Sequence, residues 1–465
     1  MRETGRSAGF AAGEGQSAAQ ESPTTYAWIV LALLTLTNLL SFMDRYLINI
    51  LAQPIKVDLG LSDAQIGLLS GFAISVSYSL VGLPLAWLAE RRNRVAIIAG
   101  SILVWSAMTA LCGRAASYGQ LVLFRVGVGI GEAGAVPASH SLITDYFPPY
   151  RRGIALAIFT AAIPLGALAG SMAGGWIVDH WNWRTAFVYL GLPGVIVAGI
   201  FALCVREVPR GRHDSGFEDT PRPRFADVAL NLWRDKVARQ VLLALTATIL
   251  VTTGASTFFA PFLARKFAIS YTEIGLVLSA TFLAGGMVGN VLGGVLVDRL
   301  SKRDRRWAAW VPALGLAVSV PFYFATYLQP TVFATAAVMM FPSIIAMVFM
   351  PPSYATLHGR TDPRSRPTMV AIVQLITSLF GGGLGPFLGG LTIDRLSELF
   401  YPASFTASCM GAIPPAGAAA QPCADALLQG TTTMLLISAP LLLWPIAHYC
   451  LAARAMRAED EASGQ

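Results

Sequence analysis

Apolar runs of about 20 residues recur along this chain, and they restrict its fold more than any other feature. Residues 95–112 and 186–204 are two such runs, and neither contains an acidic or basic residue or an alternation of polar and apolar side chains. An unsatisfied backbone polar group costs several kcal/mol in hydrocarbon, so a membrane-spanning chain must form helices or a closed barrel. Because the runs lack the alternation of barrel strands, they predict spanning helices. A composition of 55% hydrophobic and 13% charged residues agrees with a chain surrounded mostly by lipid.

The runs predict an all-α membrane protein with twelve transmembrane helices. We expect these helices near residues 27–50, 63–89, 95–113, 119–144, 153–177 and 185–204, and then near 240–263, 272–297, 307–327, 331–356, 367–392 and 431–453. The polar, proline-bearing segment between the two sets is a natural boundary. The predicted divisions are a disordered tail (1–25), a six-helix bundle (26–205), a linker (206–239), a second six-helix bundle (240–456) and a tail (457–465).

Basic residues are distributed unevenly between the two sets of loops. If the N-terminus is cytoplasmic, the loops on that side hold most of them, including Arg91, Arg92 and the linker arginines. The loops on the other side hold few, among them Lys56 and Arg114. By the positive-inside rule this asymmetry places both termini in the cytoplasm. The net charge of +7 is therefore a topology signal, and we expect no nucleic-acid partner.

Short motifs of the first half return in the second half. SDAQIGL at 62–68 matches SYTEIGL at 270–276, and GGWIVD at 174–179 matches GGLTID at 389–394. A repeat of this length predicts two bundles related by an axis along the membrane normal, with a cavity between them near the midplane. Such an architecture supports rocking of one half against the other. Chance similarity of small and apolar residues is the alternative, and the shared spacing of the motifs argues against it.

Two loop segments carry a family signature. Residues 82–97 (GLPLAWLAERRNRVAI) and 293–306 (GGVLVDRLSKRDRR) each combine a small residue, an acid and clustered basic residues. They resemble the two copies of the major facilitator signature, although Glu90 replaces the usual aspartate and Asn93 the usual glycine. Within that superfamily, NLLSFMDRYLINI at 38–50 and FRVGVGIGEAGA at 124–135 resemble the Spinster-like transporters, of bacterial type. The resemblance implies the major facilitator fold, alternating access and a multi-pass protein of the bacterial inner membrane.

The resemblance also implies a gate at the cytoplasmic helix ends. There, the acid and the arginines hold helix ends together in the outward-facing state and release them in the inward-facing state. The gate residues that we expect are Glu90, Arg91, Arg94, Asp298 and Arg299, with Asp145 and Arg151 as further partners. Positive-inside anchoring is the simpler alternative, and it accounts for the arginines but not for the duplicated acids.

Four charged residues fall inside predicted helices, where a charge costs at least about 2.5 kcal/mol. They are Asp44 and Arg45 in the first helix and Arg125 and Glu132 in the fourth. At about 1.5 Å per residue, Asp44 and Arg125 lie at matched depth on helices of opposite direction, and Glu132 lies two turns beyond Arg125 on the same face. A structural ion pair is the alternative interpretation. The second half lacks these charges at the corresponding positions, which favours a functional role.

We expect these charges to couple transport to protons. Burial disfavours the charged form of a carboxyl group and a nearby arginine favours it, so a rocking movement can switch which effect dominates. The resemblance to Spinster-like transporters implies that Asp44 is the protonation site, Arg125 its modulator and Glu132 a coupling or substrate-binding residue. Arg45 points about 100° away from Asp44 on an ideal helix, so we expect it to pair elsewhere or to extend toward the membrane surface. We also count it among the candidates for substrate binding.

The second half offers a largely apolar wall to the predicted cavity. Its polar candidates for substrate binding are Thr252, Asn290, Tyr354 and Gln374, which lie among many Phe, Met and Leu residues. A charged wall opposite an apolar wall suits a lipid-like amphiphile, with its head on the first half and its tail on the second. Ordinary interhelical hydrogen bonding is the alternative role for most of these polar side chains.

The sequence therefore predicts a secondary transporter, proton-coupled, monomeric and without a cofactor, that moves an amphiphile of the lysophospholipid or sphingoid type. Its expected partners are this substrate, protons and membrane lipids. One alternative is a proton-coupled transporter of small organic anions or drugs, with Arg45 and Arg125 as counter-ions. Another is a non-transporting receptor or scaffold. We expect no enzyme, because the chain has no set of nucleophile, base and orienting residue and no metal cluster.

Two of the five cysteines, Cys409 and Cys423, share one polar loop between predicted helices. They can form a disulfide if this loop faces an oxidising compartment. Free thiols are the alternative, and the sequence does not decide between the two.

Overall fold

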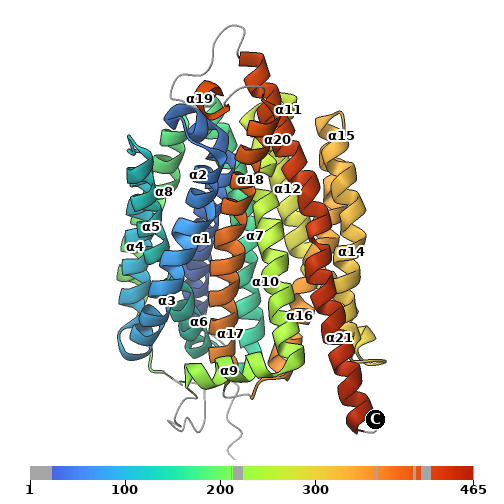
Figure 1. Cartoon of the computed structure of the whole chain (residues 1–465). Coiled ribbons are helices and arrows are strands. Elements are labelled where there is room, and N and C mark those ends of the chain that lie inside the picture. Colours follow the sequence, from blue (N-terminus) through green and yellow to red (C-terminus); the bar gives the residue numbers. More distant parts are fainter. Residues whose placement is uncertain are drawn as a thin grey trace, which may run out of the picture.

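The protein is an all-helical bundle, shown as a computed structural model in Figure 1. The structure describes residues 24–210, 212, 224–362, 365–401, 405–409 and 420–463. Nearly all of the predicted N-terminal tail therefore lies outside the described residues. Within them, twelve helical spans are long and apolar enough to cross a membrane, as the sequence predicts.

Six of these spans form the first half. They are α1 (Thr25–Leu59); α2 (Asp63–Gly67), the π-helical η1 (Leu68–Phe72) and α3 (Ala73–Arg91); α4 (Arg94–Cys112); α5 (Tyr118–Glu132) and α6 (Ala135–Tyr146); α7 (Pro149–His180); and α8 (Trp183–Cys204). Side-chain caps fix where several of them begin, because the first backbone N–H groups of a helix have no partner inside it. Ser62 is one example: it accepts from the backbone of Gln65, whose side chain accepts from Ser62 in return.

The other six spans form the second half. They are α10 (Lys236–Thr257) and α11 (Phe259–Phe267); α12 (Tyr271–Leu283), η2 (Ala284–Gly289) and α13 (Asn290–Leu300); α14 (Trp307–Leu328); α15 (Val332–Ala346), η3 (Met347–Phe349) and α16 (Met350–Gly359); α17 (Arg366–Ile376), η5 (Thr377–Gly383) and α18 (Leu384–Phe400); and α20 (Ala420–Leu441) with α21 (Leu443–Ser463). The capping pair of the first half recurs here, with Ser270 and Glu273 at the start of α12.

Helix ends depart from the sequence prediction mainly by being longer. The last span was expected near 431–453, but α20 and α21 together cover Ala420–Ser463, so most of the predicted C-terminal tail is helical. A count of apolar residues detects only the part of a helix that lies in hydrocarbon, and the polar ends of a helix extend beyond it. The predicted linker also contains a short helix, α9 (Phe225–Arg234), that we did not expect.

The two halves pack against each other through helices of both repeats. In particular, α7 packs on α12, and α18 packs on α2. Figure 1 shows α9 lying across one end of the bundle, and α19 (Phe405–Cys409) at the opposite end, which we call the α9 end and the α19 end. One hydrophobic cluster contains residues of both halves, for example Leu51, Ile66, Phe262 and Ile274.

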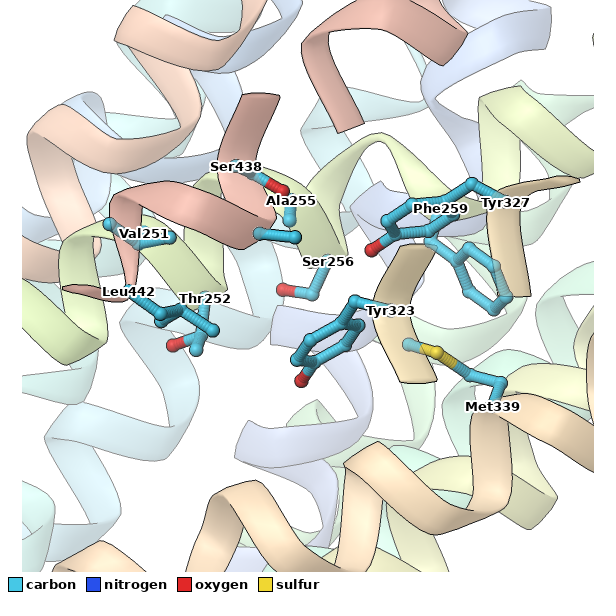
Figure 2. A pocket seen from close by; sticks show the side chains of 11 residues that line it. Val251, Thr252, Ala255, Ser256, Phe259, Tyr323, Tyr327, Met339, Ser438 and Leu442 are labelled. Atoms are coloured by element: carbon cyan, nitrogen blue, oxygen red, sulfur yellow. The ribbon is translucent and has the colours of Figure 1, made fainter. Parts of the chain in front are cut away.

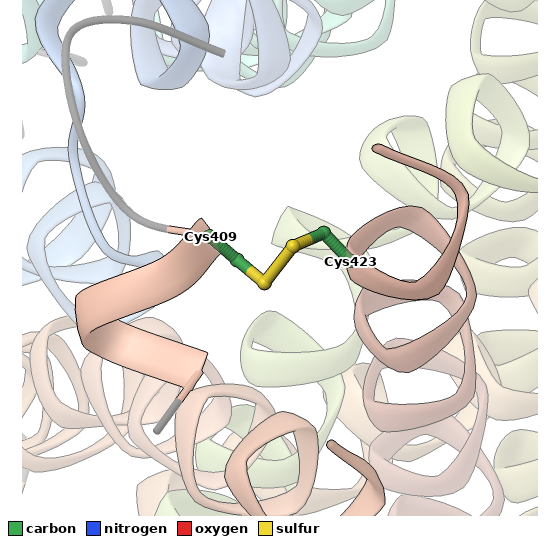
Figure 3. The surroundings of a disulfide bond; sticks show 2 residues. All are labelled: Cys409 and Cys423. Atoms are coloured by element: carbon green, nitrogen blue, oxygen red, sulfur yellow. A yellow bond between two sulfur atoms is a disulfide. The ribbon is translucent and has the colours of Figure 1, made fainter. Parts of the chain in front are cut away.

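Cys409 and Cys423 are joined in a disulfide at the α19 end (Figure 3). The bond links α19 to α20, and the two Cα atoms are 5.6 Å apart. The structure thus resolves the alternative that the sequence left open.

Candidate transport site

The four charged residues of the membrane interior meet in the first half. Asp44 and Arg45 lie in the middle of α1, with Asp44 about 29 Å from the first residue of that helix. Arg125 and Glu132 lie on α5, and Glu132 is its last residue. Asp44, Arg125 and Glu132 are buried, with 4%, 0% and 1% of their surface exposed. The side chain of Arg45 is 31% exposed.

Asp44 and Arg125 form a loose ion pair. Their nearest atoms, Oδ1 of Asp44 and Nη1 of Arg125, are 3.6 Å apart, which is beyond hydrogen-bond distance. The hydroxyl of Thr109 on α4 donates to the other oxygen, Oδ2, at 2.8 Å. Within the described residues, Oδ1 of Asp44 and all three guanidinium nitrogens of Arg125 have no hydrogen-bond partner. A buried charge in this condition is costly, so this pair is poorly suited to act as a structural lock.

Arg45 and Glu132 form a tight ion pair. Nη2 and Nε of Arg45 each lie 2.7 Å from Oε2 of Glu132, and the Ser41 hydroxyl donates to Oε1 at 3.0 Å. The guanidinium also lies over the rings of Phe42 and Tyr78, at 5.3 and 5.1 Å from their centroids. An aromatic frame of this kind attracts a cation through the negative faces of the rings. This pair is therefore well satisfied, and part of its arginine remains exposed.

These contacts agree with the predicted geometry of the four ions. The matched depth of Asp44 and Arg125 is confirmed by their contact, and Arg45 pairs elsewhere, with Glu132. Sequence reasoning missed Ser41, Tyr78 and Thr109. A hydroxyl inside an apolar run gives no signal that distinguishes a partner of an ion from a group that bonds its own helix.

Of the predicted gate residues, Arg94 and Asp145 come together inside the first half. Arg94 is fully buried and forms an ion pair with Asp145 and another with Glu207, the latter at 2.6 Å. Its guanidinium also donates to Ser141 at 2.9 Å and to the carbonyl of Val208 at 2.7 Å.

The remaining gate candidates are exposed at the surface, except for one whose side chain the structure does not describe. The exposed ones are Arg91, Arg151, Asp298 and Arg299. Arg151 lies over the ring of Tyr150, 5.8 Å from its centroid. The Glu90 side chain lies outside the described part of the structure.

The structure does not bring the four second-half candidates together. Thr252 bonds the carbonyl of Thr248 at 2.8 Å, and Asn290 that of Gly286 at 2.8 Å. Gln374 is exposed and donates to Ser378 at 3.0 Å, while Tyr354 packs against the second-half core.

Thr252 lines a small cavity of about 40 Å³ inside the second half (Figure 2). Ser256 comes from the same helix, Tyr323 and Tyr327 from α14, and Ser438 from α20. A cavity of this size holds a few water molecules or a few methylene groups, so it accepts a small part of a larger solute. Among the described residues, no group of three or more His, Cys, Asp and Glu side chains can hold a metal ion.

Comparison with known proteins agrees with this architecture. The sequence profile described as Major Facilitator Superfamily matches residues 34–262 and 241–414. An "MFS-type efflux pump" of Mycolicibacterium smegmatis is 33% identical, over 80% of this chain and 86% of the relative. The "Sphingosine-1-phosphate transporter SPNS2" of Danio rerio is 27% identical, over 80% of this chain and 77% of the relative.

One solved structure matches almost the whole fold. It is the crystal structure of a bacterial homolog of the human lysosomal transporter Spinster, in an inward-facing and unoccupied conformation. The TM-score is 0.84 and the identity 31%, over 94% of this chain and 99% of that chain.

Proposed function

Because this chain belongs to the major facilitator superfamily and to its Spinster-like transporters, we propose that it is a proton-coupled transporter of an amphiphilic, lipid-like solute. The single observation that carries the proposal is the unequal satisfaction of the two interior ion pairs. Asp44 and Arg125 are sealed from solvent and incompletely bonded. Arg45 and Glu132 are tightly paired, and Arg45 is partly exposed while Glu132 is buried. Two pairs with different access suit two different tasks.

We assign the sealed pair to the proton. Burial favours the neutral carboxyl group of Asp44, and the adjacent guanidinium of Arg125 favours the carboxylate. The 3.6 Å gap between them leaves both effects adjustable, because a small helix displacement closes or widens it. When the guanidinium of Arg125 is close, Asp44 releases its proton to water on the side that is open, and the carboxylate pairs with Arg125. When the gap widens, Asp44 takes up a proton from water again. Thr109 keeps Oδ2 occupied in the present arrangement, so Oδ1 is the oxygen that exchanges the proton.

We assign the exposed pair to the solute. A charged side chain on a spanning helix avoids lipid, so the exposed part of Arg45 faces the space between the halves. The neighbouring Tyr46 supports this placement, because its ring lies 4.6 Å from that of Phe282 in the second half. An anionic head group can replace Glu132 beside Arg45, or a cationic one can replace Arg45 beside Glu132. The aromatic rings of Phe42 and Tyr78 remain in place in either case.

An amphiphile fits the contrast between the two walls. The spans of the second half contain no Asp, Glu, Lys or Arg over most of their length. This holds within residues 240–264, 274–297, 307–328, 332–359, 367–393 and 426–453. A tail can lie along such a wall while its head remains on Arg45 and Glu132. The relative from Danio rerio is named as a transporter of sphingosine-1-phosphate, which is an amphiphile of this kind.

The test is uptake of a fluorescent lysophospholipid into proteoliposomes under an imposed pH gradient. We expect the gradient to stimulate uptake by the wild type and not by Asp44→Asn. Asp58→Asn is the matched control, because Asp58 lies on the same helix in an exposed pair with Arg184 and should retain the stimulation. Full stimulation of uptake by the gradient in Asp44→Asn would refute the assignment of Asp44 to the proton. Absence of any lipid uptake by the wild type would refute the proposed lipid-like substrate.

A further inference from the structure

The repeated motifs meet each other across the two halves. Asp179 ends the GGWIVD motif of the first half, and its carboxylate accepts from the backbone N–H groups of Tyr271 and Thr272 at 2.9 and 2.7 Å. These N–H groups begin α12, at the start of the SYTEIGL motif. The Thr272 hydroxyl donates to Asp179 as well, at 2.6 Å. The first half therefore holds the start of a second-half span.

The second half does the same in return. Asp394 ends the GGLTID motif, and its two carboxylate oxygens accept from the N–H groups of Asp63 and Ala64, each at 2.9 Å. These groups begin the span that contains α2, at the SDAQIGL motif. The first N–H groups of a helix lack partners inside the helix and carry a partial positive charge, so a carboxylate from elsewhere satisfies them well. Each half thus caps a helix of the other half.

Close backbone packing accompanies both caps. A Cβ atom at Gly175 would overlap the carbonyl oxygen of Tyr271, and one at Gly390 would overlap the carbonyl oxygen of Asp63. Glycine at these two positions permits the approach that the carboxylates need. The GG element of each repeated motif therefore has the same purpose as the acid that follows it.

The Asp394 cap is reinforced by a buried charge network. Asp63 pairs with Lys56 of its own half and with Arg265 of the second half, the latter at 2.6 Å. Arg265 also donates to Gln53 at 2.9 Å and to Thr431 at 2.6 Å. The capping acid Asp394 is half-buried, whereas the capping acid Asp179 is exposed. We therefore expect the two caps to differ in strength.

We propose that Asp179 and Asp394 are positioning residues of the transport cycle, which form a clasp that holds the α19 end closed in this conformation. Their hydrogen bonds to the other half must break when that end opens. A helix start that leaves its capping carboxylate exposes N–H groups to water, so the clasp favours the closed arrangement without making it permanent. The inference uses the alternating-access movement of the family. It does not depend on proton coupling or on the identity of the solute.

The experiment measures the width of the α19 end by spin-label distances between Gly119→Cys on α5 and Phe333→Cys on α15. Both positions are exposed, and Cys204→Ser with Cys450→Ser removes the accessible or partly accessible thiols. Asp394→Ala should raise the ratio of long-distance to short-distance population by roughly tenfold or more, because both charge-assisted N–H bonds of this cap are lost. Asp394→Asn should restore part of the short-distance population, because an amide oxygen still accepts an N–H bond.

Asp179→Ala should raise the ratio of long-distance to short-distance population by a smaller factor. Gly390→Ala should raise this ratio by a large factor, because the added methyl group overlaps the backbone of Asp63. Asp425→Ala is the control, since Asp425 is exposed near the start of α20 and accepts a hydrogen bond from Gln421 of the same helix. Distance distributions that stay at the wild-type form in Asp179→Ala, Asp394→Ala and Gly390→Ala would overturn the proposal. Asp179→Ala keeps the test decisive if a buried variant fails to fold.

Discussion

Two buried arginines in the first half have opposite surroundings. Arg94, near the α9 end, is wholly buried and bonds Asp145, Glu207, Ser141 and the Val208 carbonyl. Arg125, in the membrane interior, is equally buried, yet none of its nitrogens has a hydrogen-bond partner within the described residues. Arg94 is therefore suited to maintaining structure, whereas the unsatisfied Arg125 supports our proposal that its surroundings change during transport.

The largest expected effect is on stability. Arg94→Met removes the buried cation from the ion pairs with Asp145 and Glu207, and loss of one member of a buried pair costs about 3–5 kcal/mol. Arg125→Met leaves Asp44, which can take up a proton and remain neutral with its Thr109 bond, so we expect a loss below about 1 kcal/mol at pH 6. Unfolding of the purified variants in detergent measures both.

Equal destabilisation by Arg94→Met and Arg125→Met would mean that Arg125 is structural too. Arg151→Met is a suitable control for both, because Arg151 is exposed and its removal should leave stability unchanged.

The next effect separates the two interior pairs. Glu132→Gln weakens the Arg45 pair and keeps the contacts of Asp44 with Thr109 and Arg125. We therefore expect the lysophospholipid concentration at half-maximal uptake to change by roughly tenfold, equivalent to about 1.4 kcal/mol. The stimulation by a pH gradient should remain. Concentration series in proteoliposomes, with and without the gradient, give both quantities, and loss of the stimulation alone would transfer the proton assignment from Asp44 to Glu132.

The smallest effect concerns Thr109. Thr109→Val keeps the shape of the side chain and removes the hydrogen bond to Oδ2 of Asp44. That bond favours the carboxylate, so without it the pH of half-maximal uptake should rise by up to about one unit. A pH profile of uptake checks this shift. Ser106→Ala, on the same helix, provides the reference. Identical pH profiles of uptake for Thr109→Val and Ser106→Ala would mean that Thr109 has no part in proton coupling.

Much of the fold follows from the sequence because backbone polar groups in lipid must be hydrogen-bonded within the protein, which long apolar helices achieve. The twelve predicted spans agree with the twelve observed ones, and the prediction erred at polar helix ends and in the short helices α9 and α19. Helices of ten and five residues are too short to stand out beside runs of about 20 apolar residues. The matched depth of Asp44 and Arg125 followed from helix rise alone. These features depend on periodicity along one helix.

The partners of these residues depend on packing between helices, which a single sequence does not display. Thr109, Glu207 and Tyr78 look like ordinary loop or helix residues until three-dimensional structure places them beside an ion. Similarly, the repeated acids Asp179 and Asp394 were visible as motif letters. The contact of each acid with a helix of the other half depends on how the two halves pack.

The most direct test of the account counts protons that move with the solute. Proteoliposomes that contain a pH-sensitive dye receive unlabelled lysophospholipid, and the internal pH is followed together with lipid uptake. For the wild type we predict a change of internal pH that scales with the lipid moved. For Asp44→Asn we predict lipid movement without that change, and proton movement by Asp44→Asn at the wild-type ratio would contradict the account.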